Sequence, residues 1–299
     1  MASQESQTFH AGLRELAADR ELVAQRPLVE RREGMGFGKF TAEPEAIDWR
    51  AEEIDGITAV WSEPEGVAGC DVLMYLHGGG YVFGSAWHWR KLTGHLACHS
   101  RRRVLCPDYR LAPEHPHPAA LLDSVRSYRW LLDMGYSPRN IAFAGDSAGG
   151  GLVLTTLLML REEKLEQPAA AVCLSPWTDL ACSGDSMTSN AEVDLVANAK
   201  ILLQLVAQFA PEADVKDPLV SPLYGDYSGI CPLYLQVGGD EVLLDDSVRL
   251  ASVAEAAGVD VTLDVYPEMQ HVFQVAAGNL PEADEALDRI GRFLQDHLA

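Results

Sequence analysis

The sequence has little positive charge. Its 299 residues include 23 lysines and arginines against 44 aspartates and glutamates, which gives a net charge of -21. A chain this acidic repels phosphate backbones and anionic lipid headgroups, so we expect no nucleic-acid partner. The simplest physical consequence of the charge is solubility.

Cysteines are few and scattered. The six of them stand at positions 70, 98, 106, 173, 182 and 231, with no Cys-x-x-Cys pair and no cysteine–histidine cluster of metal-ligand spacing. We therefore expect reduced thiols and no bound metal.

Long apolar runs are also missing. The longest, GLVLTTLLML at residues 151–160, falls well short of the ~20 residues that a membrane helix needs. The first residues, MASQESQTFH, contain no basic region followed by an apolar stretch, as a secretory signal would. The sequence thus predicts no membrane span and a cytoplasmic location.

From about residue 46 onward, short β-rich runs alternate with longer helical patterns. This rhythm predicts an α/β domain with a mainly parallel sheet. Eight strands are expected, at 46–54, 57–63, 71–77, 103–109, 140–146, 169–176, 233–239 and 261–268. Helices are expected near 87–100, 118–134, 148–163, 243–257 and 281–298. No Gly/Ser linker and no internal repeat divides the chain.

Two segments fall outside this rhythm and are predicted to form an α-helical cap. Residues 1–45 contain apolar positions among charges, followed by a loose GMGFG turn. A second cap insertion is expected around 178–215, with a helix over 191–210, because long insertions between strands are often functional. The alternative is that the N-terminal helix merely packs on the core. With the cap segment over 1–45, the predicted catalytic domain spans 46–299 and includes the second cap insertion.

A serine between glycines marks a candidate nucleophile. In NIAFAGDSAGGGL an expected strand ends, Gly145-Asp146-Ser147-Ala148-Gly149 turns, and a helix begins, which is the setting of a GxSxG nucleophile elbow. Glycines two positions on either side let neighbouring backbone crowd the turn and lift the hydroxyl above the sheet. We predict that Ser147 is the nucleophile of a serine hydrolase.

A serine hydroxyl needs a base and a carboxylate that orients the base. In α/β-hydrolases the chain order is nucleophile, acid, histidine, with the latter two after late strands. By position we predict Asp240 as the acid, in preference to Glu241, and His271 as the base. Asp245 and Asp246 are competing acids, but they fall on the following helix.

The oxyanion of an acyl-transfer reaction needs backbone donors. MYLHGGGYVFGS at 74–85 ends an expected strand in three glycines, whose N–H groups no side chain obstructs. We predict that Gly78 and Gly79 form an oxyanion hole together with the N–H of Ala148. His77 is expected to support the loop.

Six stretches taken in order resemble the hormone-sensitive-lipase-like branch of the α/β-hydrolases, the bacterial carboxylesterases with an HGGG motif: HGGGYVFG, PDYRLAPEHPHPAALLD, GDSAGGGL, DPLVSPLYGD, GGDEVLLDDS and YPEMQHVFQ. The resemblance covers roughly residues 70–275 and implies an α/β-hydrolase fold with an eight-stranded sheet and an N-terminal cap. It implies the same roles for the site residues named above. It also implies that four residues of the second stretch brace a loop beside the site: Asp108, Tyr109, Arg110 and Glu114.

The functional hypothesis is therefore a serine carboxylesterase that cleaves esters of short to medium acyl chain through an acyl-enzyme, without a metal or organic cofactor. The alternatives are a lactone hydrolase or an amidase on the same triad. Another alternative is a ligand receptor without catalysis, although receptors of this family lack the triad histidine that His271 supplies.

Four aromatic side chains follow the strand-end motifs and are expected to line an apolar acyl or alcohol pocket: Tyr81, Phe83, Trp87 and Trp177. The expected partner is a small ester or lactone. The last strand, in LDVYPEMQ at 263–270, offers an edge to a second copy of the chain, so a homodimer is one oligomeric state that the sequence allows.

Overall fold

The computed structural model describes residues 3–34, 37–67 and 69–298, without the side chain of Phe37. Met35 and Gly36, in the expected GMGFG turn, lie outside the described residues. All eight predicted strands are present, each within two residues of the expected ends: β1 (Ile47–Ile54), β2 (Ile57–Pro64), β3 (Val72–Leu76), β4 (Arg103–Pro107), β5 (Ile141–Asp146), β6 (Ala170–Leu174), β7 (Leu233–Gly238) and β8 (Val261–Tyr266).

The strands form one sheet in the order β1-β2-β4-β3-β5-β6-β7-β8. The β1–β2 and β2–β4 pairs are antiparallel, and every neighbouring pair from β4 to β8 is parallel. The carboxyl ends of the parallel strands therefore meet at one edge of the sheet, where ligands bind in open α/β sheets.

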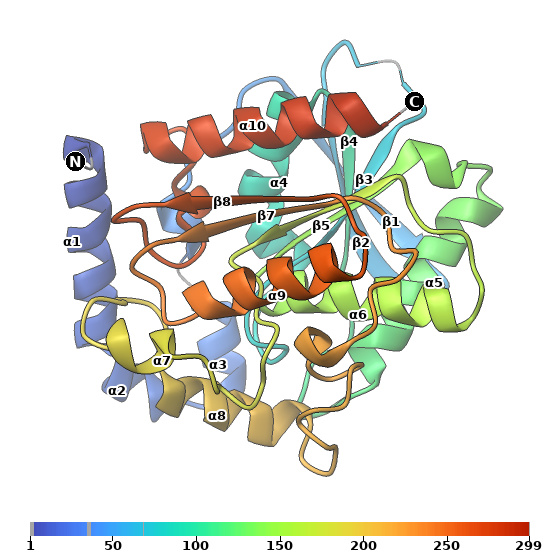
Figure 1. Ribbon diagram of the computed structural model, residues 1–299. Helices are drawn as coiled ribbons and strands as arrows, with labels where there is room; N and C mark the ends of the chain where they lie inside the picture. Colours follow the sequence, from blue (N-terminus) through green and yellow to red (C-terminus); the bar gives the residue numbers. More distant parts are fainter. Residues whose placement is uncertain (1–2, 35–36, 68, 299) are drawn as a thin grey trace.

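Helices cover both faces of the sheet (Figure 1). On one face lie α4 (Ala86–Ser100) and α10 (Pro281–His297), and on the other lie α5 (Ala119–Asp133), α6 (Ala148–Glu162) and α9 (Leu244–Ala256). Because both faces are covered, the central strands are buried along their whole length, as β3, β5, β6 and β7 show. The fold is the α/β-hydrolase-type architecture that the motifs predict.

The N-terminal segment forms α1 (Gln4–Ala18), α2 (Arg20–Ala24), α3 (Leu28–Glu33) and the short η1 (Phe37–Lys39). Part of it packs on the core, because Phe9 and Leu13 are buried and Phe9 meets Phe40 edge-on at 5.2 Å. By contrast, α2 and α3 bury no residue. Thus α1 contributes to the buried core, whereas α2 and α3 lie on its outside.

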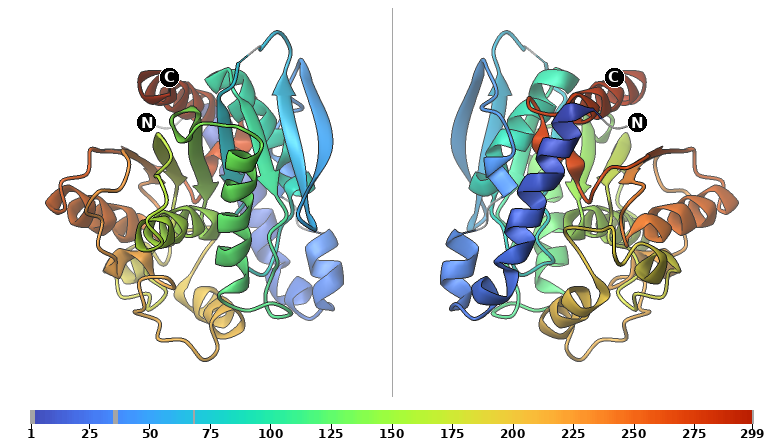
Figure 2. Two further views of the ribbon diagram at one scale, coloured as in Figure 1. Left: turned by 90° about the vertical axis from the view of Figure 1, so that its right-hand side faces the viewer. Right: turned by 90° about the vertical axis from the view of Figure 1, so that its left-hand side faces the viewer.

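The second insertion contains α7 (Ser186–Ser189) and α8 (Ala199–Phe209), with the short η3 (Pro222–Tyr224) after it. The expected helix over 191–210 is therefore too long at its start. Asn198 begins α8, because its side chain accepts the N–H of Ile201. In both figures α2, α3 and α8 lie at the lower end of the molecule (Figures 1 and 2). The division into cap and catalytic domain stays a prediction.

The remaining short elements are η2 (Pro138–Asn140) and η4 (Phe273–Ala276). All six cysteines lie among the described residues and are free. Among the described residues, no helix combines the length and the apolar character that crossing a membrane requires.

Candidate active site

Ser147 lies between the end of β5 and the first residue of α6. Its backbone has φ 53° and ψ -121°, a conformation that residues with a side chain rarely adopt. Its N–H donates to the carbonyl of Leu174 at 2.8 Å, and its own carbonyl accepts the N–H of Trp177 at 2.9 Å. These bonds to the strand-end loop after β6 fix the sharp turn that carries the hydroxyl.

The flanking glycines allow a backbone contact that no larger residue permits. A Cβ on Gly149 would lie 2.0 Å from the carbonyl oxygen of Leu76, and one on Gly145 would lie 2.5 Å from the carbonyl oxygen of Gly149. The first turn of α6 therefore rests directly on the ends of β3 and β5. This close approach explains the two glycines around Ser147.

His271 follows β8 and reaches the nucleophile. Its Nε2 lies 2.9 Å from the hydroxyl oxygen of Ser147, and its ring is buried, with 7 % of the residue exposed. A base at this distance accepts the proton of the hydroxyl when the oxygen attacks. The sequence-based placement of Ser147 and His271 thus corresponds to a bonded pair in the structure.

The carboxylate on His271 is Glu241, which corrects the prediction of Asp240. Glu241 Oε2 accepts a hydrogen bond from His271 Nδ1 at 2.7 Å, and the Glu241 side chain is fully buried. The Asp240 residue is partly exposed, and its N–H donates to the carbonyl of Met269. Burial raises the pKa of the Asp240 carboxyl, while the charge of His10 opposes this.

The second oxygen of Glu241 has its own donors. Oε1 accepts the hydroxyl of Ser175 at 2.6 Å and the N–H of Gly238 at 2.5 Å. The hydroxyl oxygen of Ser175 in turn accepts the N–H of Val272, one residue after His271, at 3.1 Å. Ser175 thus connects the Glu241 carboxylate to the loop that carries His271. Sequence reasoning did not identify it, although its place after β6 is a signal.

A segment of the second insertion, residues 190–197, holds the backbone beside the acid and the base. Asn190 donates to the carbonyls of Gly239 and Glu241 at 3.0 and 2.8 Å. Asp194 accepts the N–H of Val242 at 2.8 Å. These bonds fix the loop that carries Glu241.

The same segment also bonds the residue before His271. Gln270 accepts the N–H of Leu195 at 2.7 Å and donates to the carbonyl of Val193 at 3.0 Å. Residues 190–197 form turns and bends rather than a helix. Side chains accept the N–H groups of Leu195, Val196 and Ala197, which a helix would use internally.

The electrostatics of His271 suit a base. Burial lowers the pKa of His271, but the charge of Glu241 and the hydrogen bond to that carboxylate outweigh burial. The pKa of His271 is therefore raised above the ordinary histidine value of 6.5. The buried carboxylate also holds the proton on Nδ1, which leaves the Nε2 lone pair for Ser147.

The glycine loop after β3 corrects a second prediction. The N–H of Gly78 donates to Asp146 Oδ1 at 2.8 Å, so it is not free to bind an oxyanion. Within the described parts of the chain, no acceptor bonds the N–H groups of Gly79, Gly80 and Ala148. Gly79 has φ +109° and Gly80 has φ +63°, which turns the loop at these two residues. Gly80 therefore takes the place predicted for Gly78.

Asp146 is the anchor of the glycine loop. Its Oδ1 also accepts the hydroxyl of Tyr75 and the indole N–H of Trp89, both at 2.8 Å. Burial raises the pKa of Asp146 to about 6, although the bonds from Tyr75 and Gly78 act in the opposite direction. Because Asp146 precedes Ser147, one residue connects the nucleophile turn to the loop of backbone donors.

His77 and two residues of the DYRLAPE stretch, Asp108 and Tyr109, form contacts around the glycine loop. The His77 ring stacks on Tyr109 at 4.3 Å between ring centres, and the Tyr109 hydroxyl donates to the His77 carbonyl at 2.6 Å. Asp108 accepts the N–H of Ala86 at 2.5 Å. His77 thus lies behind the glycine loop, as the sequence predicts.

Two further residues of the DYRLAPE stretch form ion pairs. Arg110 binds Asp123 with two N–H groups at 2.8 Å each. Glu114 binds Arg32 of α3 in the same two-point manner, also at 2.8 Å, which connects the N-terminal segment to this loop.

Three of the four predicted pocket aromatics lie beside the glycine loop. Tyr81 and Trp177 are buried, with 6.3 Å between their ring centres. Phe209, at the end of α8, stacks on Tyr81 at 3.7 Å and was not predicted. Phe83 is partly buried beneath Arg31, whose guanidinium lies 4.8 Å from the ring centre. Tyr81, Trp177 and Phe209 thus belong to one buried core, to which the second insertion contributes Phe209.

Trp87 is placed differently from the prediction. It is 56 % exposed, and the guanidinium of Arg90 lies 4.5 Å from its ring centre. A side chain this open does not form the wall of an enclosed acyl pocket.

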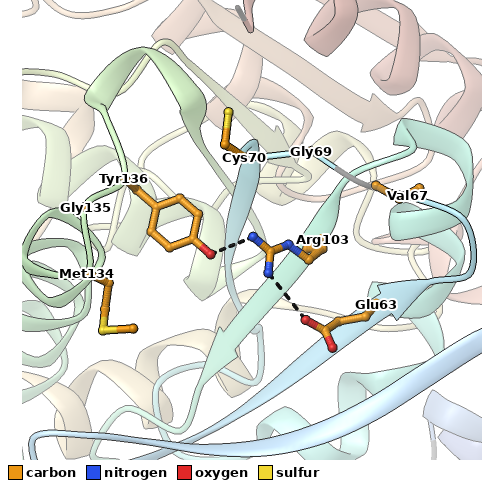
Figure 3. Close-up of a pocket in the computed structure, with 8 residues that line it drawn as sticks. All are labelled: Glu63, Val67, Gly69, Cys70, Arg103, Met134, Gly135 and Tyr136. Carbon is orange, nitrogen blue, oxygen red and sulfur yellow. Dashed lines mark hydrogen bonds and ion pairs between the residues drawn. The ribbon is translucent and has the colours of Figure 1, made fainter.

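A hollow of about 720 Å³ lies at the opposite edge of the sheet, at the amino ends of β3, β4 and β5 (Figure 3). Arg103 crosses it, 2.7 Å from the hydroxyl of Tyr136 and 3.6 Å from Glu63. Its charged groups pair with each other, and the Ser147–His271–Glu241 chain lies at the carboxyl ends of the strands. The hollow is therefore not the site of this chemistry.

The comparisons with known proteins agree with this geometry. Residues 73–275 match a family model described as having the alpha/beta hydrolase fold. A crystal structure of an esterase from the bacterial hormone-sensitive lipase family superimposes with a TM-score of 0.93, at 41 % identity and with all of both chains covered. The chain belongs to the α/β-hydrolase family and, within it, to the hormone-sensitive-lipase-like carboxylesterases.

Two relatives carry names that describe their reactions. An acetyl-hydrolase of Streptomyces hygroscopicus is 42 % identical over 238 residues, which cover 80 % of this chain and 79 % of the relative. An ethyl acetate hydrolase of Pseudomonas putida is 36 % identical over 234 residues, 76 % of this chain and 73 % of the relative.

Proposed function

We propose that this chain hydrolyses carboxylic esters of short acyl chain, with Ser147 as nucleophile, His271 as base and Glu241 as the carboxylate that orients the base. Ester hydrolysis is the reaction of its family. The observation that carries the residue assignment is the continuous series of bonds from Glu241 through His271 to Ser147, at 2.7 and 2.9 Å. A ligand receptor without catalysis has no need for this series.

The reaction begins when the Ser147 oxygen attacks the ester carbonyl carbon and His271 Nε2 takes the hydroxyl proton. The tetrahedral intermediate collapses when the carbon–oxygen bond to the alcohol breaks and His271 gives that proton to the departing alcohol. Water then attacks the acyl-enzyme with the same base, and the acid leaves. Glu241 orients the ring and stabilises the imidazolium that forms.

The negative charge of the tetrahedral oxygen falls among the N–H groups of Gly79, Gly80 and Ala148. These donors are fixed before the reaction, because Asp146 anchors the glycine loop and the turn of Ser147 fixes Ala148. Donors that need no reorganisation act most strongly on charge that develops in the transition state.

The proposed preference for short acyl groups rests on the side chains around the glycine loop and on the names of two relatives. Tyr81 and Trp177 are almost fully buried, and Leu205 of α8 fills the space where a Cβ on Gly80 would lie, at 2.5 Å. We expect these side chains to leave little width above the glycine loop for a long acyl chain. The names acetyl-hydrolase and ethyl acetate hydrolase, borne by two relatives, describe two-carbon acyl groups.

The test is a p-nitrophenyl ester series from acetate to decanoate, measured with the wild type and with Ser147→Ala. We expect kcat/KM to be greatest for acetate or butyrate and to fall by about 10⁴-fold or more in Ser147→Ala. A folded Ser147→Ala enzyme with wild-type turnover would refute the nucleophile. A maximum at decanoate would refute the acyl preference alone. Including a lactone and an anilide separates the two alternatives on the same triad.

We further propose that two copies pair through β8. In the described sheet β8 bonds β7 on one side and no strand on the other, and Val265 is 44 % exposed. An open strand edge with an exposed apolar side chain is a natural pairing surface. Sedimentation equilibrium should give the mass of a dimer, and a monomer at all concentrations would refute the pairing. A cytoplasmic location stays a prediction.

A further inference from the structure

A second group of ligating side chains lies outside the triad, between α4 and α10. His95 and His99 stand one helical turn apart on α4, and Asp284 lies in the first turn of α10. One ligand atom from each of the three lies within 4.8 Å of the other two. Two imidazoles and a carboxylate are a donor set that suits borderline divalent ions such as Zn²⁺.

Each histidine already uses one ring nitrogen for a bond that orients it. His95 Nε2 donates to the carbonyl of Ala42 at 3.1 Å, and His99 Nδ1 donates to the carboxylate of Asp288 at 2.7 Å. Because carbonyl and carboxylate oxygens only accept, the neutral rings carry their protons on these two nitrogens. The lone pairs then fall on His95 Nδ1 and His99 Nε2.

Asp284 is oriented in the same way. Its Oδ1 accepts the N–H of Gly278 at 2.8 Å, which leaves its other oxygen for a ligand. Gly278 also lies against the ring of His95, since a Cβ on this glycine would come within 2.9 Å of His95 Cε1. The loop at Gly278 thus fixes the carboxylate and the ring together.

This pattern is the one found around bound metals. A histidine that binds a metal through one nitrogen usually donates the other N–H to a carboxylate or a backbone carbonyl, which fixes the ring and its tautomer. His99 donates to the carboxylate of Asp288, and His95 donates to the backbone carbonyl of Ala42, so both rings are held as this rule describes. An exposed histidine–aspartate pair alone would stabilise little and would not explain the converging third ligand.

The space and access also suit an ion. Zinc bonds of 2.0–2.1 Å place tetrahedral ligands about 3.4 Å apart, so ligand atoms that lie within 4.8 Å of one another need to approach by at most about 1.4 Å. The side chains of His99 and Asp288 are 21 % and 57 % exposed, which leaves room for this rotation and lets solvent reach the site.

We propose that His95, His99 and Asp284 bind one divalent cation of the zinc class, that Asp288 orients His99, and that water supplies the fourth ligand. The bound ion would connect α4, α10 and, through Ala42, the segment that leads from the N-terminal helices to the sheet. Its role is to stabilise this junction, not to take part in ester hydrolysis.

The test uses the full chain after chelator treatment. Calorimetric titration with ZnCl₂ should show one ion per chain, and Co²⁺ should give the visible absorption of a four-coordinate site. With Zn²⁺ at about 100 times its Kd, the Tm should rise by roughly 4 °C. Mg²⁺ at millimolar concentration should not compete, because imidazole is a poor ligand for it.

Variants assign the ion to these residues. The double variant His95→Gln/His99→Gln should lose the zinc stoichiometry and the Tm shift while it hydrolyses p-nitrophenyl acetate at the wild-type rate, which shows that it is folded. Asp284→Asn keeps an acceptor for Gly278 and should weaken binding at least tenfold.

The matched control is His115→Gln, which removes an exposed histidine elsewhere and should leave zinc binding unchanged. The proposal is overturned if the wild type binds no zinc. It is equally overturned if the double variant and Asp284→Asn bind zinc as the wild type does.

Discussion

Two neighbouring carboxylates in this chain have opposite surroundings. Glu241 is fully buried and accepts bonds from Ser175, Gly238 and His271, whereas Asp240 is partly exposed. Although the two residues are adjacent in the chain, the side chain of Glu241 lies inside the site and that of Asp240 lies at its outer side. At the residue scale, the identity of the acid therefore depends on the direction of a turn, and mutation of both residues can test it.

We expect Glu241→Gln to lower kcat by about 10⁴-fold, because the amide no longer stabilises the imidazolium or holds its tautomer. Asp240→Asn, the matched control, should change kcat less than about threefold. The measurement is steady-state hydrolysis of p-nitrophenyl acetate by variants with wild-type circular dichroism spectra. The reverse ranking would show that Asp240 is the acid after all.

The pH dependence offers a second residue-scale test. Activity needs neutral His271, so kcat/KM should fall as the pH drops through the pKa of His271, which the charge of Glu241 raises against the effect of burial. The acid limb of the wild type should therefore lie above pH 6.5. Glu241→Gln removes the charge that raises the pKa of His271, while burial still lowers this pKa. The acid limb of the residual activity should therefore move to lower pH. A limb that stays in place would contradict the assignment.

At the scale of elements, the local patterns were predictable and the long-range bonds were not. Strand ends and the turn at Ser147 follow from apolar runs and glycine spacing, which are local properties. The commitment of the Gly78 N–H to Asp146 was not predictable, because its acceptor comes 68 residues later in the chain. The late start of α8, at Ala199 instead of residue 191, was likewise not predictable. Apolar spacing does not reveal the hydrogen bonds that Asp194 accepts before the helix.

The clamp by residues 190–197 can be weakened at Asn190. We expect Asn190→Ala to remove two bonds to the loop of Glu241, to lower kcat by about tenfold and to destabilise the fold by about 1–3 kcal/mol. Gln204→Ala, an exposed change on α8 of the same insertion, is the control and should alter neither. The measurements are steady-state kinetics and urea unfolding. Equal effects of the two changes would show that Asn190 does not position the acid.

For the whole molecule, buried carboxylates make stability depend on pH. Burial raises the pKa of Asp146 to about 6 and that of Asp246 to about 7. At these two carboxyls the folded chain keeps protons that the unfolded chain has released, so their contribution to the free energy of unfolding falls as the pH rises through these values. The net charge of -21 acts in the same direction, because repulsion grows as carboxylates ionise. Histidines whose pKa is lowered by burial contribute in the opposite direction.

We expect the titration of Asp246 to lower the free energy of unfolding by about 1.4 kcal/mol between pH 6 and pH 8, which corresponds to about 2 °C in Tm. Asp246→Asn should reduce this dependence, since the amide oxygen can still accept the N–H groups of Thr178 and Asp179 but does not titrate. Differential scanning calorimetry across this range is the measurement. The same dependence of Tm on pH in the variant and in the wild type would contradict the argument.

The bonds from Asn190, Asp194 and Gln270 have a consequence for how an ester gets in. The insertion that carries α8 over the glycine loop also holds the acid and the base in register. A movement of the whole insertion would pull the proton-transfer groups apart at the moment of substrate entry. Any movement of α8 that admits an ester must therefore leave residues 190–197 in place, which confines it to the chain from Asn198 onward, where α8 begins.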